Sequence, residues 1–340
     1  MKLLIVVHHH FDLWNVPAWF AEKLRADFPQ IEVVYRTRYD GIEQHLRDAE
    51  ILFAFLLRPE QFRLAPNLRW IHAPTAAVHQ LLFPELVTSD VVLTNAREVH
   101  GPVVAEHVMA LIFALAKKIP QAARLQQKRT WGQETIWNEG PRPREVVGAT
   151  LGLIGLGSIG RTVARMASAL GMRVIAVREH PEKERPEGVA AVYAPSQIDD
   201  VLSQSEYVVV AAPLTEATHG LINADRLAAM RPDAFLINVG RGPHVDETAL
   251  ADALRSRRIA GAALDVFEQE PLPAESPLWA LENLLITPHT ASLTEKLWQR
   301  QCQYALFSEN LRRYLSGPPI AVIHRGQADG LLELGSSMFR

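Results

Sequence analysis

Residues 146–180, VVGATLGLIGLGSIGRTVARMASALGMRVIAVREH, decide the fold of this chain. A short apolar run, 151–154, leads into closely spaced glycines, and apolar residues then recur at helical spacing. A second apolar run, 172–177, follows the helical part. The stretch therefore predicts a strand, a tight turn, a helix and a second strand, which together make a βαβ unit.

The glycines of this stretch form a G-x-G-x-x-G pattern at Gly155, Gly157 and Gly160. In such a unit the first glycine permits the turn, the second lets the backbone approach a pyrophosphate, and the third lets the helix pack closely on the strand. The N-terminus of the helix offers free N–H groups and a positive dipole end to phosphates, and Ser158 and Ile159 are predicted to contact the cofactor. The pattern alone is weak, because glycines also collect in ordinary loops, but the flanking strands favour a dinucleotide site.

The residue that closes the βαβ unit is Arg178, where a protein selecting NAD normally has an acidic residue for the ribose 2′-hydroxyl. A guanidinium suits a 2′-phosphate and offers no acceptor to a hydroxyl. We therefore predict NADP as the cofactor, with NAD used less readily. An arginine solvated at the strand end, beside Glu179, remains the alternative.

The bulk composition limits the class of protein. A chain of 340 residues exceeds what one hydrophobic core usually serves, so we expect two domains. A net charge of -3 with interspersed acids and bases argues against a nucleic-acid or anionic-membrane surface. The single cysteine, Cys302, cannot form an internal disulfide, which fits the cytoplasm.

Neither a membrane segment nor a metal site is expected. MKLLIVVHHH at the amino terminus is typical of a first β-strand, and the apolar stretch from Val103 to Ala116 is too short to span a bilayer. Three consecutive histidines, His8 to His10, cannot converge on one ion without further ligands.

Residues 1–98 alternate short apolar runs with helical segments, as in an α/β domain with a mainly parallel sheet. Within this part, PTAAVHQLLF at 74–83 follows a strand and leads into a helix. Its backbone N–H groups could bind a carboxylate, although an ordinary turn explains the pattern equally well. Arg58 follows another strand and could reach the same carboxylate site, although a surface arginine is the simpler interpretation.

A long helix is predicted over Val103–Gln127, and its first half is apolar nearly all round. Burial on more than one side favours a second copy of the chain as the covering surface, so we predict a homodimer. Residues 131–144, rich in Pro, Gly and charge, are predicted to form a connecting loop.

After Arg178 strands and helices alternate again, which predicts a doubly wound parallel sheet with ligands beyond the carboxyl ends of its strands. Three strand ends carry Arg241, Glu270 and His289. Arginine binds a carboxylate bidentately, histidine exchanges a proton near neutral pH, and a carboxylate beside an imidazole favours its charged form. With a nicotinamide ring this set suffices for hydride transfer between a 2-oxo acid and a 2-hydroxy acid.

From about Leu52 to Tyr314 the chain resembles the D-isomer-specific 2-hydroxyacid dehydrogenase family, through GLGSIG, PLTEATHGLI, LINVGRGPHVDETAL, GAALDVFEQEPL and LLITPHTAS. The resemblance implies a catalytic set of Arg241, Glu270 and His289. It also implies that Asp265 lies near the nicotinamide carboxamide, and that four further residues lie against the cofactor: Ala212, Pro213, Val239 and Gly240.

The same resemblance implies two α/β domains. A doubly wound, Rossmann-type cofactor domain, residues 99–290, would be inserted into a smaller flavodoxin-like substrate domain made of residues 1–98 and 291–340. The dimer would form through the cofactor domain.

A substrate carboxylate is implied to lie against Ala76, Ala77 and Val78, with Arg241. The family commonly has glycine where this chain has Ala77, so the loop backbone is expected to differ there. Arg178, in place of the usual acid, points toward the NADP-using glyoxylate and hydroxypyruvate reductases of the family. The alternatives are a reductase for a bulkier acid, such as phenylpyruvate or a branched-chain 2-oxo acid, and a corepressor-like protein that only senses the nucleotide.

Overall fold

The computed structural model describes residues 1–76, 78–96, 99–299 and 303–317. The chain divides into two compact units, one of residues 1–100 together with residues from Leu293 onward, and one of residues 101–292. We call them unit 1 and unit 2. Their boundaries lie close to the predicted ones at 98/99 and 290/291, and their assignment to substrate and cofactor stays a prediction.

Unit 1 is built on a parallel five-stranded sheet. Its order is β2-β1-β3-β4-β5, the flavodoxin-like order of a doubly wound sheet. The strands are β1 (Lys2–Val6), β2 (Glu32–Arg36), β3 (Ile51–Ala54), β4 (Trp70–Ala73) and β5 (Val92–Asn95).

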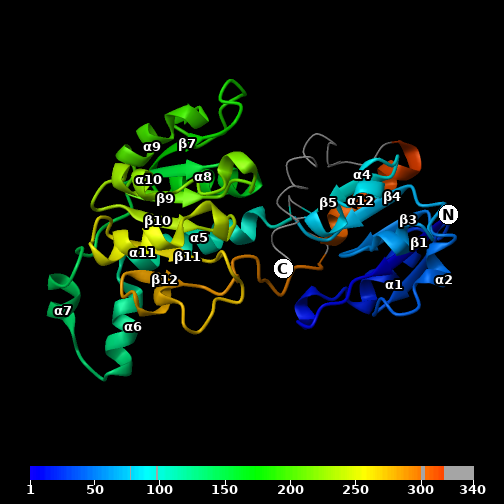
Figure 1. The fold of residues 1–340 in the computed structure, drawn as a ribbon, viewed down its shortest axis with the longest axis horizontal. Helices are drawn as coiled ribbons and strands as arrows, with labels where there is room; N and C mark the ends of the chain where they lie inside the picture. Colours follow the sequence, from blue (N-terminus) through cyan, green and yellow to red (C-terminus); the bar gives the residue numbers. More distant parts are fainter. Residues whose placement is uncertain (77, 97–98, 300–302, 318–340) are drawn as a thin grey trace. The chain divides into compact units, whose positions relative to one another are not determined.

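Helices cover both faces of this sheet because its strands are apolar on both sides. Leu3 and Ile5 pack with α1 (Ala18–Asp27) and α12 (Gln303–Ser316), and the intervening Leu4 packs on the other face. That second face is covered by α2 (Glu43–Leu46), α3 (Pro59–Phe62) and α4 (Pro84–Val87). The late helix α12 therefore completes the core of a unit that the first hundred residues begin (Figure 1).

Unit 2 holds a parallel sheet of seven strands in the order β12-β11-β10-β9-β6-β7-β8. The direction of winding reverses between β6 and β9, as in a Rossmann fold. The predicted fold class is confirmed. The strands are β6 (Thr150–Ile154), β7 (Arg173–Val177), β8 (Ala191–Tyr193), β9 (Tyr207–Val210), β10 (Phe235–Asn238), β11 (Gly261–Leu264) and β12 (Leu284–Ile286).

Successive residues of these strands enter two different cores. Leu153 packs with α5 (Gly101–Ala116) and α8 (Ser158–Ala169), whereas Ile154 lies in the core of the opposite face. The opposite face is covered by α9 (Ile198–Gln204), α10 (Ala224–Ala229) and α11 (Glu247–Arg255). Burial on both faces explains why the strands are continuous apolar runs rather than alternating ones.

The predicted helix over 103–127 is wrong in its length. Helix α5 ends at Ala116, Lys118 takes a left-handed φ of 55°, and α6 (Ile119–Gln127) begins anew. Pro120 explains the break, since it has no N–H to donate and is favoured in a first helical turn. The predicted loop over 131–144 also contains a helix, α7 (Gln133–Asn138). Both α6 and α7 lie outside the layers of unit 2 (Figure 1).

Within the described part of the chain, no helix combines the length and the apolar character needed to cross a membrane.

Candidate active site

The glycine turn after β6 has a geometry compatible with the predicted roles, and binding of a pyrophosphate there stays a prediction. Gly155 has a φ of +106°, and a Cβ there would lie 2.9 Å from the backbone of Ala211 and Ala212. A Cβ at Gly160 would lie 2.1 Å from the carbonyl oxygen of Gly155, so α8 packs on the turn only without a side chain. At Gly157 a Cβ would meet nothing within 4 Å. The second glycine thus leaves open space over the backbone, which fits a pyrophosphate at the start of α8.

The other residues predicted to contact the cofactor gather around this turn. Ala212 and Pro213 follow β9, the strand beside β6, and Val239 and Gly240 follow β10. A Cβ at Gly240 would lie 3.3 Å from the carbonyl oxygen of Ala212, so the two loops are neighbours. Ser158 and Ile159 are the first two residues of α8. The structure therefore brings these residues together at the carboxyl ends of adjacent strands.

Two residues that sequence reasoning missed hold the loop that carries Arg241. The buried Asn238 accepts from the N–H of Gly240 at 3.0 Å and donates to the carbonyl of Arg241 at 2.9 Å. Nδ1 of His244 accepts from the N–H of Arg241 at 2.9 Å, so Nε2 is the protonated nitrogen of the neutral ring, 3.2 Å from the carbonyl of Pro213. Their signal lay in the sequence NVGRGPH, where polar side chains flank Arg241.

Arg178 directly follows β7, and its side chain is half-buried rather than solvated. Its guanidinium donates to the carbonyl of Lys183 and, at 3.1 Å, to that of Glu184. Nε of the same guanidinium is buried and has no hydrogen-bond partner among the described residues. An unsatisfied buried donor at this strand end fits an anionic group such as a 2′-phosphate, and recognition of this group stays a prediction.

Arg178→Gln is expected to lower the ratio of kcat/KM for NADPH to that for NADH by roughly 10- to 100-fold, because a charge-assisted hydrogen bond contributes about 1.5–3 kcal/mol. The measurement is steady-state kinetics with each cofactor in parallel. Arg185→Gln is the matched control, since Arg185 lies in the same loop and its guanidinium donates to the carbonyl of Ala190. An unchanged ratio in Arg178→Gln would remove Arg178 from cofactor selection.

Three groups predicted to be catalytic lie at the ends of β10, β11 and β12. Nδ1 of His289 and Oε2 of Glu270 are 2.6 Å apart, within ion-pair distance. Oε1 of Glu270 accepts from the N–H of Phe267 at 2.9 Å. Burial alone raises the pKa of Glu270, but the hydrogen bonds from His289 and Phe267, with the charges of His289 and Arg241, outweigh it and hold this pKa below its ordinary value.

Arg241 is close enough to Glu270 for the two charges to interact. Burial lowers the pKa of the Arg241 guanidinium and the charge of Glu270 opposes this shift, while arginine remains a cation. Its Nη1 donates to the carbonyl of Gly240 at 2.6 Å. The guanidinium carries further N–H donors that suit a carboxylate. A cation, an imidazole and a carboxylate thus lie at the carboxyl edge of the sheet that carries the glycine turn.

Glu270→Gln tests the pairing of the imidazole and the carboxylate. If His289 is the proton donor in the reducing direction, as predicted, activity falls at alkaline pH because the imidazolium is lost. A neutral amide removes the negative charge beside the imidazole, and we expect the alkaline fall of kcat to move to lower pH. The pH profile of kcat at saturating cofactor is the measurement. A profile that coincides with the wild type would contradict the pairing.

The predicted substrate loop lies in unit 1. There Ala76 is exposed and Val78 is buried, and Ala77 lies outside the described residues. The side chain of Asn95 donates to the carbonyl of Ala76 at 2.6 Å. Binding of a carboxylate by this loop stays a prediction.

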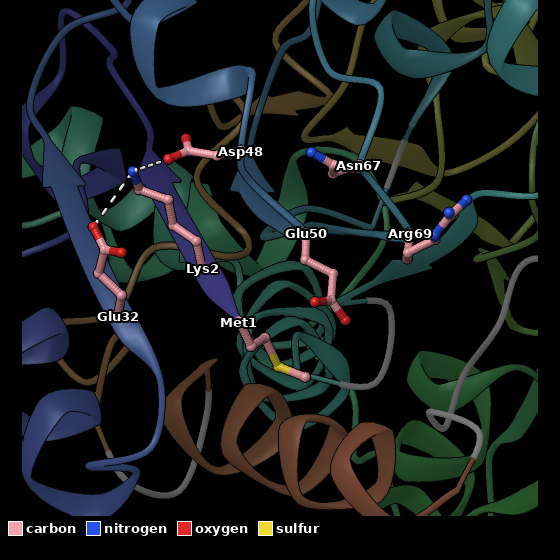
Figure 2. A pocket seen from close by; sticks show the side chains of 7 residues that line it. All are labelled: Met1, Lys2, Glu32, Asp48, Glu50, Asn67 and Arg69. Carbon is pink, nitrogen blue, oxygen red and sulfur yellow. Dashed lines mark hydrogen bonds and ion pairs between the residues drawn. The ribbon is translucent and has the colours of Figure 1, made fainter.

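Unit 1 also has a hollow of about 550 Å³ at the opposite end of its strands (Figure 2). Lys2 lies between Asp48 and Glu32 there, with Nζ 2.9 and 3.3 Å from their carboxylates. The hollow is at the amino ends of β1 to β4, whereas ligands of such sheets bind at the carboxyl ends.

The described residues contain no group of three or more His, Cys, Asp and Glu side chains suited to a metal ion.

The family model described as D-isomer specific 2-hydroxyacid dehydrogenase, NAD binding domain, matches residues 109–291. The chain belongs to this family. A glyoxylate reductase of Thermofilum pendens is 35% identical over 291 residues, which is 82% of this chain and 83% of the relative. Another glyoxylate reductase, of Korarchaeum cryptofilum, is 33% identical over 92% of this chain and 89% of the relative.

Solved structures of 2-hydroxyacid dehydrogenases share the fold. One from Xanthobacter autotrophicus, in complex with NADPH and MES, is 31% identical with a TM-score of 0.79 and covers 96% of this chain and 99% of its own. Another is an NADPH-dependent glyoxylate/hydroxypyruvate reductase of Sinorhizobium meliloti, in complex with NADP and sulfate. It is 26% identical with a TM-score of 0.79, and the match covers 96% of this chain and 100% of the reductase. The predicted family, and with it a dehydrogenase that uses a nicotinamide dinucleotide, is confirmed.

Proposed function

We propose that this 2-hydroxyacid dehydrogenase reduces a small 2-oxo acid of the glyoxylate or hydroxypyruvate type to the D-2-hydroxy acid, with NADPH as the reductant. The 2.6 Å pair of His289 and Glu270, beside Arg241 and at the edge that holds the glycine turn, is the observation that carries the proposal. The names of the relatives from Thermofilum pendens and Sinorhizobium meliloti support the substrate class.

The three groups have distinct roles in this reaction. The fork of Arg241 binds the substrate carboxylate and polarises the neighbouring 2-oxo group, and His289 donates the proton to the oxygen that becomes the hydroxyl. Glu270 orients the imidazole and stabilises its charged form until the proton leaves. Backbone amides of Ala76 to Val78 would contribute to carboxylate binding.

The cofactor would lie over the glycine turn, with its pyrophosphate on Gly157 and the start of α8 and its 2′-phosphate near Arg178. NADPH, when bound, supplies the hydride that adds to C2 of the substrate. The NADPH- and NADP-bound relatives support this cofactor, and NAD is the weaker alternative.

The proposal is tested by NADPH oxidation against glyoxylate, hydroxypyruvate, pyruvate and phenylpyruvate, with the same panel repeated with NADH. We expect the highest kcat/KM for glyoxylate or hydroxypyruvate with NADPH. A preference for phenylpyruvate would replace the substrate class by that of a bulkier acid. No turnover with any substrate, together with NADPH binding, would favour a nucleotide-sensing protein.

We also infer a cytoplasmic homodimer formed through unit 2. Its single cysteine supports the location. Helix α5 is strongly apolar, and its Phe113 is 36% exposed. The region after α5 exposes three more large apolar side chains: Ile119 by 57%, Trp131 by 94% and Trp137 by 50%. Such exposure favours a covering partner. Sedimentation at micromolar concentration should give the mass of two chains, and a monomer at that concentration would refute the dimer.

A further inference from the structure

We propose that His107, Thr287 and Asp265 are positioning residues that hold the turn carrying His289. The proposal rests on the proposed function, in which His289 is the proton donor. Asp265 follows β11, Thr287 follows β12, and His107 comes from the middle of α5, so three elements of unit 2 meet behind the turn. The three proposed catalytic residues, Arg241, Glu270 and His289, do not belong to this cluster.

Both oxygens of the Asp265 carboxylate accept hydrogen bonds from the segment that carries His289. Oδ1 accepts from the hydroxyl of Thr287 at 2.6 Å and from the N–H of Thr290 at 2.9 Å. Oδ2 accepts from the N–H of Ala291 at 3.0 Å. The backbone carbonyl of Asp265 accepts from the N–H of His289 at 2.8 Å. One residue therefore fixes the turn on either side of the imidazole.

The turn needs this support because His289 has a φ of +51°, in the left-handed region that residues with a side chain rarely adopt. Such a conformation persists only where the surrounding contacts over-determine it. With the turn in this conformation, Nδ1 of His289 lies 2.6 Å from Oε2 of Glu270. Loosening the turn would lengthen that contact.

Thr287 links the carboxylate to α5. Its hydroxyl has one proton, and the short 2.6 Å distance gives that proton to Asp265. Toward His107 the hydroxyl oxygen can then only accept, so Nε2 of His107, 3.2 Å away, is the donor. Burial lowers the pKa of His107 while the charge of Asp265 opposes this shift, and the lowered pKa favours the neutral ring.

The alternative is that Asp265 contacts the nicotinamide carboxamide directly. Its side chain is only 1% exposed and both oxygens already accept hydrogen bonds, which leaves little surface for a ligand. The two roles differ in what they change. Loss of positioning lowers kcat and disturbs the pairing of His289 with Glu270, whereas loss of a cofactor contact raises the Kd for NADPH.

Matched variants separate these roles without touching a proposed catalytic group. Thr287→Val removes the hydroxyl and keeps the shape of the side chain, and Thr287→Ser restores the hydroxyl. His107→Leu removes the donor, and His107→Gln keeps an N–H group at the place of Nε2. For each variant we would measure kcat, the Kd for NADPH from its fluorescence, and the titration of the His289 imidazole by NMR in the absence of cofactor.

For Thr287→Val and His107→Leu we expect roughly 5- to 10-fold lower kcat, a Kd for NADPH within twofold of the wild type, and a lower midpoint for the His289 titration, since one lost hydrogen bond contributes about 1 kcal/mol. Thr287→Ser and His107→Gln should recover most of the activity. A raised Kd for NADPH with an unchanged His289 titration, or an unchanged kcat, would overturn the proposal.

The NMR titration also separates this proposal from the proposed function. If the wild type reduces none of the 2-oxo acids, the proposed function fails, and the titration in the variants still shows whether the cluster fixes the imidazole. If the wild type is active and the titration does not move in the variants, only the positioning role fails.

Discussion

His289→Gln is expected to lower kcat for 2-oxo acid reduction by roughly 10²- to 10⁴-fold, the usual contribution of a positioned general acid. Glutamine keeps an amide that can donate a hydrogen bond, but it has no proton to transfer near neutral pH. The Kd for NADPH should remain within a few-fold, because the imidazole is assigned to the proton and not to the nucleotide. Rapid-mixing kinetics at saturating NADPH are the measurement.

His45→Gln is the matched control for this variant, since it makes the same exchange at a helix of unit 1, in α2. It should retain wild-type kcat. A wild-type kcat in His289→Gln would remove the imidazole from the reaction. A loss of kcat in that variant accompanied by an equally large loss of NADPH binding would instead indicate a damaged cofactor site.

Arg241→Ala is expected to lower kcat/KM for the 2-oxo acid by roughly 10²- to 10³-fold, comparable to the loss of a donor to a developing oxyanion. Both KM and kcat should worsen, because the guanidinium is assigned to the substrate carboxylate before the reaction and to the 2-oxo group during it. Arg241→Lys keeps the charge and loses the fork, so its activity should lie between those of Arg241→Ala and the wild type.

Thermal unfolding checks that the Arg241 variants fold, since Nη1 of Arg241 also donates to the carbonyl of Gly240. The melting temperature should fall by a few degrees at most, as expected for about 1 kcal/mol. If Arg241→Ala changed KM alone and left kcat intact, the arginine would only bind the substrate and would have no part in the reaction.

Much of the fold could be predicted because the signals are local. The apolar run 151–154, the glycine turn and the helix after it lie within one short stretch, and the later strands repeat the pattern. Arg241, Glu270 and His289 could be predicted to lie together because they follow strands of one parallel sheet, whose carboxyl ends lie along the same edge. The structure adds the contact distance, which is 2.6 Å between Nδ1 of His289 and Oε2 of Glu270.

The parts that could not be predicted depend on competing or distant contacts. The apolar periodicity continues through Lys118, yet Pro120 restarts the helix there. The contact of His107 with Thr287 could not be predicted, because the two residues are distant in the sequence. The hydrogen bonds of Arg178 to the loop at 183–184 likewise depend on a loop conformation that composition does not specify.

The return of α12 to the core of unit 1 has a consequence for synthesis on the ribosome. Strand β5 ends at Asn95 and α12 begins at Gln303, so about 200 residues are made between them. At roughly 5–20 residues per second this takes about 10–40 s. During that time the apolar face that Phe307 later covers, including Phe53 and Trp70, is exposed on the nascent chain. Unit 2 is contiguous in sequence and can fold first, which makes the first hundred residues the part that most needs a chaperone.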